Sequence, residues 1–379
     1  MTEIKEAPDT PAIKAAISLG NLKHMLKLVG PAALGKTTIP ILSCVRMEQL
    51  ADGFAIEATD LEIAIRALVP EMSGMEKPTI IPAEKLIAWT KLLTGQDVKL
   101  SATDRRATLQ CGRSRAVMPI MDVSNWPATS FTLDGAAATL KQGDFLRALR
   151  FAQIAISPDE SRYTLNGLLV QGDGSTLRLV ATDGHRLLLY SMPCSEKIDN
   201  LLLPMRLIKV LLSLLSDGDA GMDIAFDANQ ITATIAGLTP VFVSSRKIQG
   251  SFPNWEAVMP RDNNVHVTVK AAELLASLER CMLLSDERSG CVRLTFDEQI
   301  TIEASSSQNG EASETLDCTG GPEKKLTVGV AGAYLIDLVK KLDGDLVIAL
   351  PDSNQKPLLL KATPHEGQTV DYVVMPMRV

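Results

Sequence analysis

The sequence predicts three α+β domains of similar fold, arranged in series along a chain of 379 residues. Three observations indicate this fold class. Each third of the chain repeats one order of elements: a strand, a helix, a hairpin of alternating residues, a second helix and further strands. Short motifs recur at nearly constant spacing, and the first two thirds both end in a segment containing Asn, Trp and Pro. Many strands follow one another through tight turns, which favours antiparallel sheets.

Each third opens with an amphipathic helix, in which apolar residues recur at three- and four-residue intervals. The predicted ranges are Asn21–Gly30, Lys141–Gln153 and Ala271–Ser285. A hairpin follows, and its motif Ile56–Asp60 (IEATD) in the first third matches Leu179–Asp183 (LVATD) in the second. The two Thr-Asp pairs lie 123 residues apart, which sets the length of the repeat.

A second helix comes next in each third, predicted at Ala83–Gly95, Pro204–Ser216 and Gly332–Lys341. In the first two thirds a proline marks its start, and Pro82 and Pro204 lie 122 residues apart. The third copy keeps the helix without this proline. The repeats therefore place three domains at residues 1–130, 131–256 and 257–379, joined by short linkers near 127 and 255. We expect a polar leader, residues 1–12, to be disordered.

The composition excludes several classes of protein. Hydrophobic residues make up 46% of the chain and charged residues 22%, as in a soluble globular protein. The N-terminus lacks the basic start and apolar run of a signal peptide, and no apolar stretch is long enough to span a membrane, so we expect a cytoplasmic protein. Six cysteines without C-x-x-C spacing or a Cys/His cluster indicate buried thiols in a reducing compartment, with no metal or other cofactor.

Charge is distributed unevenly along the sequence. The net charge of −7 argues against a surface that binds nucleic acid throughout. The six predicted helices nevertheless carry a net charge of +7, which leaves −14 on the remainder. A positive helical face attracts phosphates without reading bases, whereas a negative remainder keeps DNA away from other surfaces. This pattern suits a protein that holds DNA and slides along it, although solvated helix faces also commonly carry Lys and Arg.

Residues Gly30–Thr37 (GPAALGKT) match the phosphate-binding pattern G-x-x-x-x-G-K-[ST], which would indicate a P-loop nucleotide hydrolase. Such a loop follows a strand and opens a helix, whose first N–H groups cradle the phosphates. Here a predicted helix precedes the loop. The segment after it, Thr37–Leu42 (TTIPIL), is β-branched and contains a proline, so we predict a strand. We interpret the motif as a Gly/Pro loop in which Lys36 is solvated.

Two segments resemble the bacterial β sliding clamp, the β subunit of DNA polymerase III, almost residue for residue. The first includes Arg162–Gly167 (RYTLNG), Ala181–Leu187 (ATDGHRL) and Ser191–Pro193 (SMP). The second is the C-terminus, Tyr372–Val379 (YVVMPMRV). Weaker similarity runs from about Ile13 to the end. The three internal repeats agree independently with the three domains of that family.

The resemblance implies the DNA clamp fold, in which a head-to-tail homodimer closes into a ring with helices lining the hole and sheets outside. It implies a non-catalytic sliding clamp that encircles double-stranded DNA without sequence specificity. The implied partners are DNA polymerase III, clamp loader subunits, and other polymerases and repair proteins, bound through short linear peptides. No cofactor or membrane is implied. An accessory or decoy clamp, which binds partners without supporting the main polymerase, stays open as an alternative.

The resemblance also implies a peptide pocket between the second and third domains, whose apolar lining suits varied partners. We expect His185 and Arg186 to orient the polar groups of the peptide. Asp183 and His185 would be an acid–base pair in an enzyme, but no nucleophile motif accompanies them, and a capped hairpin turn is the simpler interpretation. Carried over residue by residue, the pocket comprises Arg162, Leu165, Thr182, Gly184, His185, Arg186, Leu187, Pro253, Val258, Val373, Val374, Met375, Pro376, Met377 and Arg378.

Candidate DNA contacts come from two sources. The predicted helices contribute Lys23, Lys27, Arg147, Arg150 and Arg206. Positions that contact DNA in the family correspond to Lys36, Glu84, Asp159, Tyr163 and Thr164. Two of these are acidic and repel phosphate, and Thr164 replaces an aromatic residue, so we expect weak DNA affinity. Ala257 likewise stands where the family has a basic pocket residue.

Overall fold

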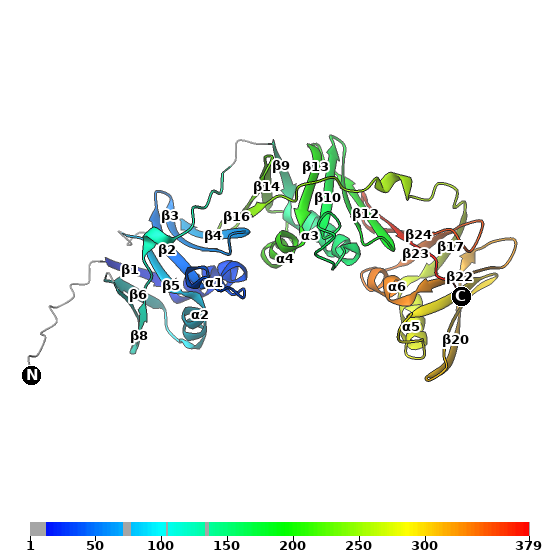
Figure 1. The fold of residues 1–379 in the computed structure, drawn as a ribbon, viewed down its shortest axis with the longest axis horizontal. Coiled ribbons are helices and arrows are strands. Elements are labelled where there is room, and N and C mark those ends of the chain that lie inside the picture. Colours follow the sequence, from blue (N-terminus) through cyan, green and yellow to red (C-terminus); the bar gives the residue numbers. More distant parts are fainter. Residues whose placement is uncertain (1–12, 71–76, 104, 133–135, 379) are drawn as a thin grey trace, which may run out of the picture. The chain divides into compact units, whose positions relative to one another are not determined.

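The computed structural model describes residues 13–70, 77–103, 105–132 and 136–378. The leader expected at residues 1–12 and the last residue of the chain, Val379, lie outside this part. The chain forms two compact units, one built from residues up to 144 together with 209–247, and the other from 145–208 together with 248 onwards. Each unit contains one long sheet and one four-stranded sheet, and the described strand pairs are antiparallel (Figure 1).

In the first unit, helix α1 (Leu19–Ala33) packs on the long sheet and against α2 (Ala83–Leu92). The eight strands of the long sheet follow the order β5 (Thr79–Pro82), β2 (Cys44–Leu50), β3 (Gly53–Thr59), β4 (Ile63–Pro70), β16 (Val241–Arg246), β15 (Gln230–Ile235), β14 (Gly221–Phe226) and β9 (Ala136–Lys141). The four-stranded sheet has the order β1 (Ile13–Ser18), β6 (Asp97–Ala102), β7 (Arg106–Cys111) and β8 (Ser114–Pro119).

In the second unit, helices α5 (Ala271–Met282) and α6 (Gly332–Val339) pack against each other. The long sheet follows the order β13 (Lys197–Pro204), β10 (Gly167–Asp173), β11 (Thr176–Thr182), β12 (Arg186–Pro193), β25 (Gln368–Val374), β24 (Leu358–His365), β23 (Asp345–Leu350), β17 (Val265–Lys270) and β21 (Thr319–Gly320). The four-stranded sheet has the order β20 (Gly310–Asp317), β19 (Gln299–Ser306), β18 (Cys291–Phe296) and β22 (Leu326–Ala331). Helices α3 (Gln142–Ala152) and α4 (Met205–Leu214) have residues in both units.

Both long sheets join strands from different thirds of the sequence. In the first unit β4 pairs with β16, and Ile63 lies opposite Ser245. In the second unit β12 pairs with β25, and Arg186 lies opposite Val374. We call these pairings the first and the second junction. Because β4 and β12 follow the equivalent Thr-Asp motifs, the two junctions are equivalent positions of the repeat.

The helices form where periodicity predicts them, with shifted ends. Helix α1 begins earlier than predicted, because the Ser18 hydroxyl accepts a hydrogen bond from the Asn21 N–H at 3.1 Å and caps it. It also continues through Gly30 and Pro31, and Ala32 and Ala33 are buried at its end. The predicted loop at Gly30 is therefore wrong, because burial of the small residues favours another helical turn over the local Gly-Pro signal.

The segment predicted as a strand, Thr37–Leu42, is not a strand. It is irregular up to a short 3₁₀ helix, Pro40–Ser43, and β2 begins only at Cys44. Pro40 lacks the N–H that a strand would donate, and the Leu42 N–H instead donates to the Ile39 carbonyl at 3.1 Å. The first half of the G-x-x-x-x-G-K-T segment thus lies inside α1, and its second half opens no α-helix, and this context excludes a P-loop.

Candidate partner-binding site and DNA-facing residues

The turn between β11 and β12 is closed by the Thr-Asp pair of the repeat. The Thr182 hydroxyl donates to the Arg186 carbonyl at 2.7 Å and accepts from the Gly184 N–H at 3.1 Å. One oxygen of Asp183 accepts from the N–H groups of His185 and Arg186, at 2.9 and 3.1 Å. The turn polar groups are therefore satisfied locally, and the carboxylate holds His185 by its backbone.

The first junction contains the same turn, built from Thr59 and Asp60. The Thr59 hydroxyl donates to the Ile63 carbonyl at 2.9 Å and accepts from the Leu61 N–H at 3.1 Å. Asp60 accepts from the N–H groups of Glu62 and Ile63 at 3.1 and 2.8 Å. The motif that identified the repeat in the sequence is thus a turn motif.

These contacts do not support an acid–base pair at Asp183 and His185, because the carboxylate accepts from the backbone of His185. Asp183 is buried, and its second oxygen accepts from Nε of Arg186 at 2.9 Å. Within the described part of the chain, no group of three His, Cys, Asp or Glu could hold a metal ion. The site offers a wall for a ligand, with no arrangement for a reaction.

The C-terminal segment lies directly beside this turn. The Met375 N–H donates to the His185 carbonyl at 2.9 Å, where the β12–β25 ladder ends. The Met377 N–H donates to the Gly329 carbonyl at 2.8 Å and so attaches the segment to β22. The last residues of the described chain are therefore fixed at two points, and the Met375 side chain is 41% exposed beside the turn.

Apolar residues of the predicted pocket form one layer on the second junction. Leu187 and Val373 lie opposite each other in the ladder and belong to a buried cluster on the long sheet. The segment 248–259 packs on this cluster through Phe252 and Trp255, and we call this segment the strap. Val258 of the strap is 45% exposed. For a ligand, Leu187 and Val373 therefore offer a packed apolar base, and Val258 and Met375 offer exposed apolar edges.

Other predicted pocket residues are placed differently. Pro253 lines a hollow of about 360 Å³ between the strap and strands β10 and β13. Arg378 lines a separate hollow of about 560 Å³ over β18, β19 and β20. Arg162 contacts the backbone of the turn, since its Nη1 donates to the Asp183 carbonyl at 3.3 Å. Leu165 lies in the same loop, and its carbonyl accepts from the Ser157 N–H.

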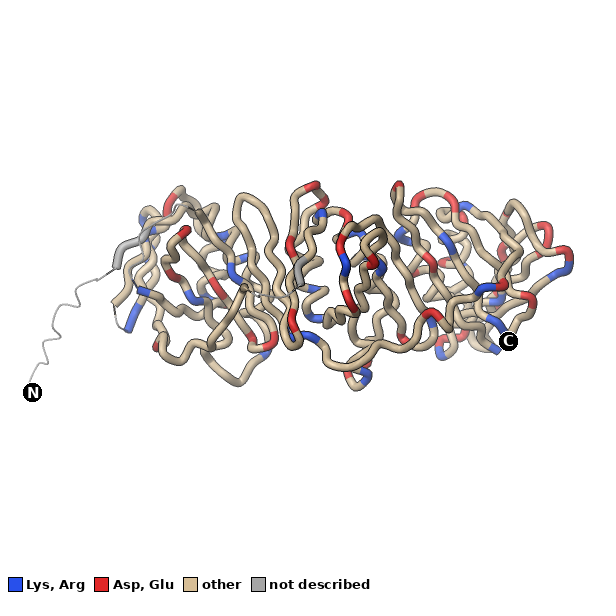
Figure 2. The backbone as a smooth tube through the Cα atoms, turned by 90° about the horizontal axis from the view of Figure 1, so that it is seen from above, with Lys and Arg blue, Asp and Glu red and all other residues tan. Residues whose placement is uncertain are grey.

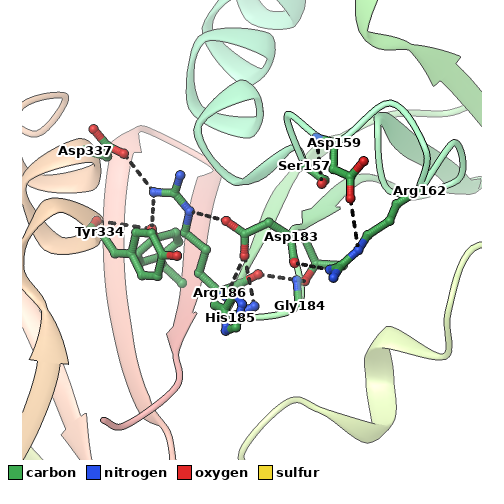
Figure 3. A network of polar contacts seen from close by, with 11 residues as sticks. Ser157, Asp159, Arg162, Asp183, Gly184, His185, Arg186, Tyr334 and Asp337 are labelled. Atoms are coloured by element: carbon green, nitrogen blue, oxygen red, sulfur yellow. Dashed lines mark hydrogen bonds and ion pairs between the residues drawn. The ribbon is translucent and has the colours of Figure 1, made fainter. Parts of the chain in front are cut away.

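Two pocket residues point away from the strap because side chains alternate along a strand. Val374 follows Val373, and Arg186 precedes Leu187, so both lie on the opposite face. Arg186 there reaches residues that the sequence did not single out, Tyr334 and Asp337 of α6 (Figure 3). The expectation that Arg186 orients the peptide therefore has no support from its geometry.

The predicted basic residues divide into two groups. Lys23 caps the end of α2, because its ammonium donates to the Leu93 carbonyl at 3.0 Å. Arg147 donates to the side-chain carbonyl of Gln368 on β25 at 2.9 Å. These two cations are already engaged in the fold. Lys27, Arg150 and Arg206 are exposed.

The family positions for DNA contact are all at the surface, apart from the half-buried Thr164. Lys36 and Glu84 are exposed, and the Tyr163 side chain is 61% exposed. Asp159 accepts from the hydroxyl and the N–H of Ser161, which together lower the pKa of Asp159 below its usual value. Its charge also lies 3.5 Å from Arg162. The repulsion expected from Asp159 is therefore partly offset within its own loop.

The observed helices are less basic than predicted. Lys141, Lys340 and Lys341 lie just outside α3 and α6, which lowers the net charge of the six described helices from +7 to +4. The remainder of the chain then carries −11. Acidic positions are spread along the chain (Figure 2). The sign of the separation is as predicted, and its size is smaller.

Comparison with known proteins decides the family. Three family models cover nearly the whole chain: the N-terminal domain of the DNA polymerase III beta subunit at residues 14–130, its central domain at 139–254 and its C-terminal domain at 256–378. The chain belongs to the DNA polymerase III beta subunit family. The family models and the observed mixture of helices and antiparallel sheets confirm the predicted fold class of three similar clamp domains.

Relatives named beta sliding clamp support the same assignment. The clamp of Salmonella typhimurium is 30% identical over 367 residues, covering 94% of this chain and 97% of that protein. The clamp of Escherichia coli K12 is 30% identical over 366 residues with the same coverage. These matches confirm a DNA sliding clamp without catalytic activity of its own, and the P-loop hydrolase is not favoured.

Solved clamp structures match the fold closely. A Pseudomonas aeruginosa sliding clamp with ligand has a TM-score of 0.89 at 25% identity, covering 97% of this chain and all of that chain. Another from the same organism, bound to griselimycin, has a TM-score of 0.88 at 26% identity. Among the described residues of this clamp chain, no helix has the length and apolar character needed to cross a bilayer.

Proposed function

We propose that two copies of this clamp chain close head to tail into a ring around duplex DNA in the cytoplasm. The observation that carries this proposal is the pattern of free sheet edges. At each junction a long sheet is made of two parts from successive repeats, and the last strand of one part (β4 or β12) pairs with the last strand of the other (β16 or β25). The corresponding strands left over in the described chain are β20 and β8, each at the edge of a four-stranded sheet.

Pairing β20 of one copy with β8 of the other would repeat the two junctions at the closure of the ring. It would also cover two exposed edges, which otherwise invite uncontrolled association. Side chains on the two edges are complementary. Strand β8 carries Arg115 and the 46% exposed Val117, whereas β20 carries Glu311 and Asp317. Two identical interfaces of this kind close a ring in which β8 and β20 are no longer free edges.

Inside such a ring the helices would face the DNA. Lys27, Arg150, Arg206 and Lys209 are the exposed basic residues of α1, α3 and α4. Contacts with phosphates alone hold DNA without fixing a register, so the ring can slide. The clamp then retains its polymerase by topology, because a closed ring cannot leave the duplex sideways.

We place the partner site at the second junction, over Leu187, Val373, Val258 and Met375. An apolar, methionine-edged surface beside a rigid turn suits short peptides of varied sequence. The partners proposed here are DNA polymerase III, clamp loader subunits, and other polymerases and repair proteins. Each would carry a short linear peptide that inserts apolar side chains between the strap and the C-terminal segment.

Topological trapping tests the ring directly. The protein is loaded onto nicked circular DNA by the cognate loader, and the DNA is then linearised. A closed ring stays on the circle through a high-salt wash and slides off the linear form. Retention that does not depend on circularity, or failure of the loaded protein to survive the wash, would overturn the ring.

A further inference from the structure

We propose that Arg186 is a positioning residue, which ties the turn beside the peptide site to helix α6 on the other face of the sheet and does not contact the peptide. This inference rests on the proposed peptide site and changes the role of one residue assigned to it. The turn is the rigid wall of that site, so whatever fixes the turn sets how well the site is formed before a peptide arrives.

The register of the second junction decides which face Arg186 occupies. Leu187 lies opposite Val373, and both belong to the layer beneath the strap. Arg186 lies opposite Val374 and is one residue removed, so its side chain leaves from the other face. Tyr372, two residues before Val374, shares that face and is fully buried. The strap and α6 therefore lie on opposite faces of the sheet, and the Arg186 side chain is on the face of α6.

The guanidinium of Arg186 is surrounded by partners on that face (Figure 3). Its Nε donates to Asp183 at 2.9 Å, and its Nη1 donates to Asp337 of α6 at 2.8 Å. Nη1 also donates to the Tyr372 hydroxyl at 3.2 Å, and that hydroxyl donates to the Tyr334 carbonyl at 3.1 Å. The guanidinium carbon lies 4.2 Å from the centre of the Tyr334 ring.

This arrangement joins three elements through one side chain: the turn through Asp183, helix α6 through Asp337 and Tyr334, and β25 through Tyr372. Only 12% of the Arg186 side chain is exposed. The planar guanidinium has donors in fixed directions and a face that stacks on the Tyr334 ring, whereas a lysine ammonium is a compact charge without a planar face. A peptide that recruited this guanidinium would have to break bonds that are already formed.

The first junction contains the same turn without an arginine that links it to a helix. There Ile63 occupies the place of Arg186, and it is buried at 1% exposure. The backbone contact is kept, because the Arg246 N–H donates to the Glu62 carbonyl at 3.1 Å, as Met375 does to His185. The turn itself is closed in the same way by Asp60. The ionic tie to a helix is thus added at the second junction, where we place the peptide site.

The test uses Asp337, which lies on α6, on the other face of the sheet from the strap and from the proposed peptide site. Asp337→Asn and Arg186→Lys are made singly and together in the full chain. Asp173→Asn is the matched control, since Asp173 pairs with Arg178 at 2.8 Å beside the turn between β10 and β11, at the other end of β11. The probe is a synthetic peptide with a Gln and a Leu/Phe pair, titrated calorimetrically at a temperature where all variants are folded.

A tie predicts that Asp337→Asn raises the Kd of the peptide about threefold to tenfold, and that the double variant is no weaker than Arg186→Lys alone. The control stays within about twofold of the unsubstituted chain. A role in stability alone would lower the unfolding temperature and leave the Kd unchanged. Equal Kd values for Asp337→Asn and the unsubstituted chain, or additive losses in the double variant, overturn the tie.

A second readout keeps the inference separate from the peptide site. Amide hydrogen exchange at His185 and Arg186 is measured without peptide, and it accelerates in Asp337→Asn if the tie holds the turn. Unchanged exchange overturns the tie whether or not peptide binds. If the unsubstituted chain binds no peptide while exchange accelerates as expected, the proposed peptide site fails and the tie stands.

Discussion

Leu61 occupies in the first junction the left-handed backbone position that Gly184 occupies in the second. Their φ angles are 77° and 93°, and each follows the Thr-Asp pair that closes its turn. A residue with a Cβ meets steric repulsion in this region, whereas glycine does not. The same turn is therefore present in both repeats, although in the first it places Leu61 in a strained conformation. The geometry of the turn matters more than the side chain at this position.

Replacing these two residues should have opposite effects on stability. Gly184→Ala should lower the free energy of unfolding by about 1 kcal/mol, because the new Cβ must adopt the left-handed conformation. Leu61→Gly relieves the same strain, and its 46% exposed side chain gives up little packing. We expect no loss, and a gain of at most about 1 kcal/mol. Urea unfolding measures both, and a clear loss in Leu61→Gly would contradict this account.

The ring proposal predicts a dimer that depends on the edge of β8. The unsubstituted chain should scatter light as about twice 40.8 kDa at micromolar concentration. Val117→Asp places a charge where the partner strand would cover it, and should shift the protein toward 40.8 kDa. Leu238→Asp is the control, since Leu238 is fully exposed at a hairpin tip. Equal masses for both variants would count against an interface at β8.

DNA association should depend on the exposed helical cations. The triple substitution of Lys27, Arg150 and Arg206 to Glu should weaken binding, and should reduce the salt dependence by about one unit of slope for each phosphate that the variant no longer neutralises. Lys23 and Arg147 are left unchanged, because they hold α2 and Gln368 and their replacement would disturb the fold.

The control for charge reverses Arg261, Lys324 and Lys325, which are exposed and lie outside the helices. It changes the net charge by the same amount as the helical triple substitution. Titrations over a range of salt concentrations compare the two triple variants. The same salt slope for both would show that the helices do not face DNA.

Removing residues Met375–Val379 should abolish binding of the synthetic peptide, because it removes one edge of the apolar layer. Loss of a pocket wall typically costs at least about 2 kcal/mol, or roughly thirtyfold in affinity. The structure shows that the segment also makes two backbone hydrogen bonds, at His185 and Gly329. A small decrease of the unfolding temperature should accompany the loss, while the dimer persists. Unchanged peptide affinity would place the pocket elsewhere.

Alkaline pH should weaken the second junction. Burial raises the pKa of Tyr372 well above its ordinary value of 10.0. The unfolded chain therefore loses this proton at lower pH than the folded chain does. Stability from Tyr372 is complete below that ordinary pKa and is lost as the pH rises through the higher folded value.

Urea unfolding at about pH 9 and about pH 11 checks this direction. Tyr372→Phe should be less stable than the unsubstituted chain at the lower pH, because it lacks two hydrogen bonds, and should show a smaller decrease between the two. Tyr163→Phe, at an exposed position, should keep the full decrease. A decrease of equal size in all three proteins would assign the effect to other groups.

Local patterns predicted the elements well, and interactions between distant residues explain most errors. The periodicity of residues 21–30 and 271–285 located helices, and the Thr-Asp motif located two turns. The C-terminal end of α1 depended on burial of Ala32 and Ala33, a tertiary effect that single-sequence patterns do not include. The strand expected at 37–42 failed for a local reason, because Pro40 lacks an N–H and its effect outweighed the β-branched neighbours.

The candidate site shows the same division. Resemblance placed Leu187, Val373 and Met375 beside one another, and the structure brings them together. It also placed Arg186 there, and no local signal could assign its face. That face depends on the register between β12 and β25, which are almost two hundred residues apart in the sequence. Asp337 and Tyr334 were missed for the same reason, since their importance depends on where α6 packs.

The long sheets also determine how the chain can be divided. The sequence suggests cuts at the linkers near 127 and 255, where the family models also end. A cut near 127 would separate β4 from β16, and a cut near 255 would separate β12 from β25. Each cut would expose the unpaired backbone N–H and C=O groups of two strands to water. A fragment with such an exposed edge strand tends to aggregate or to exchange strands with another molecule. The modules that sequence comparison recognises are thus units of descent, and the smallest parts that remain soluble when expressed alone should each span a junction.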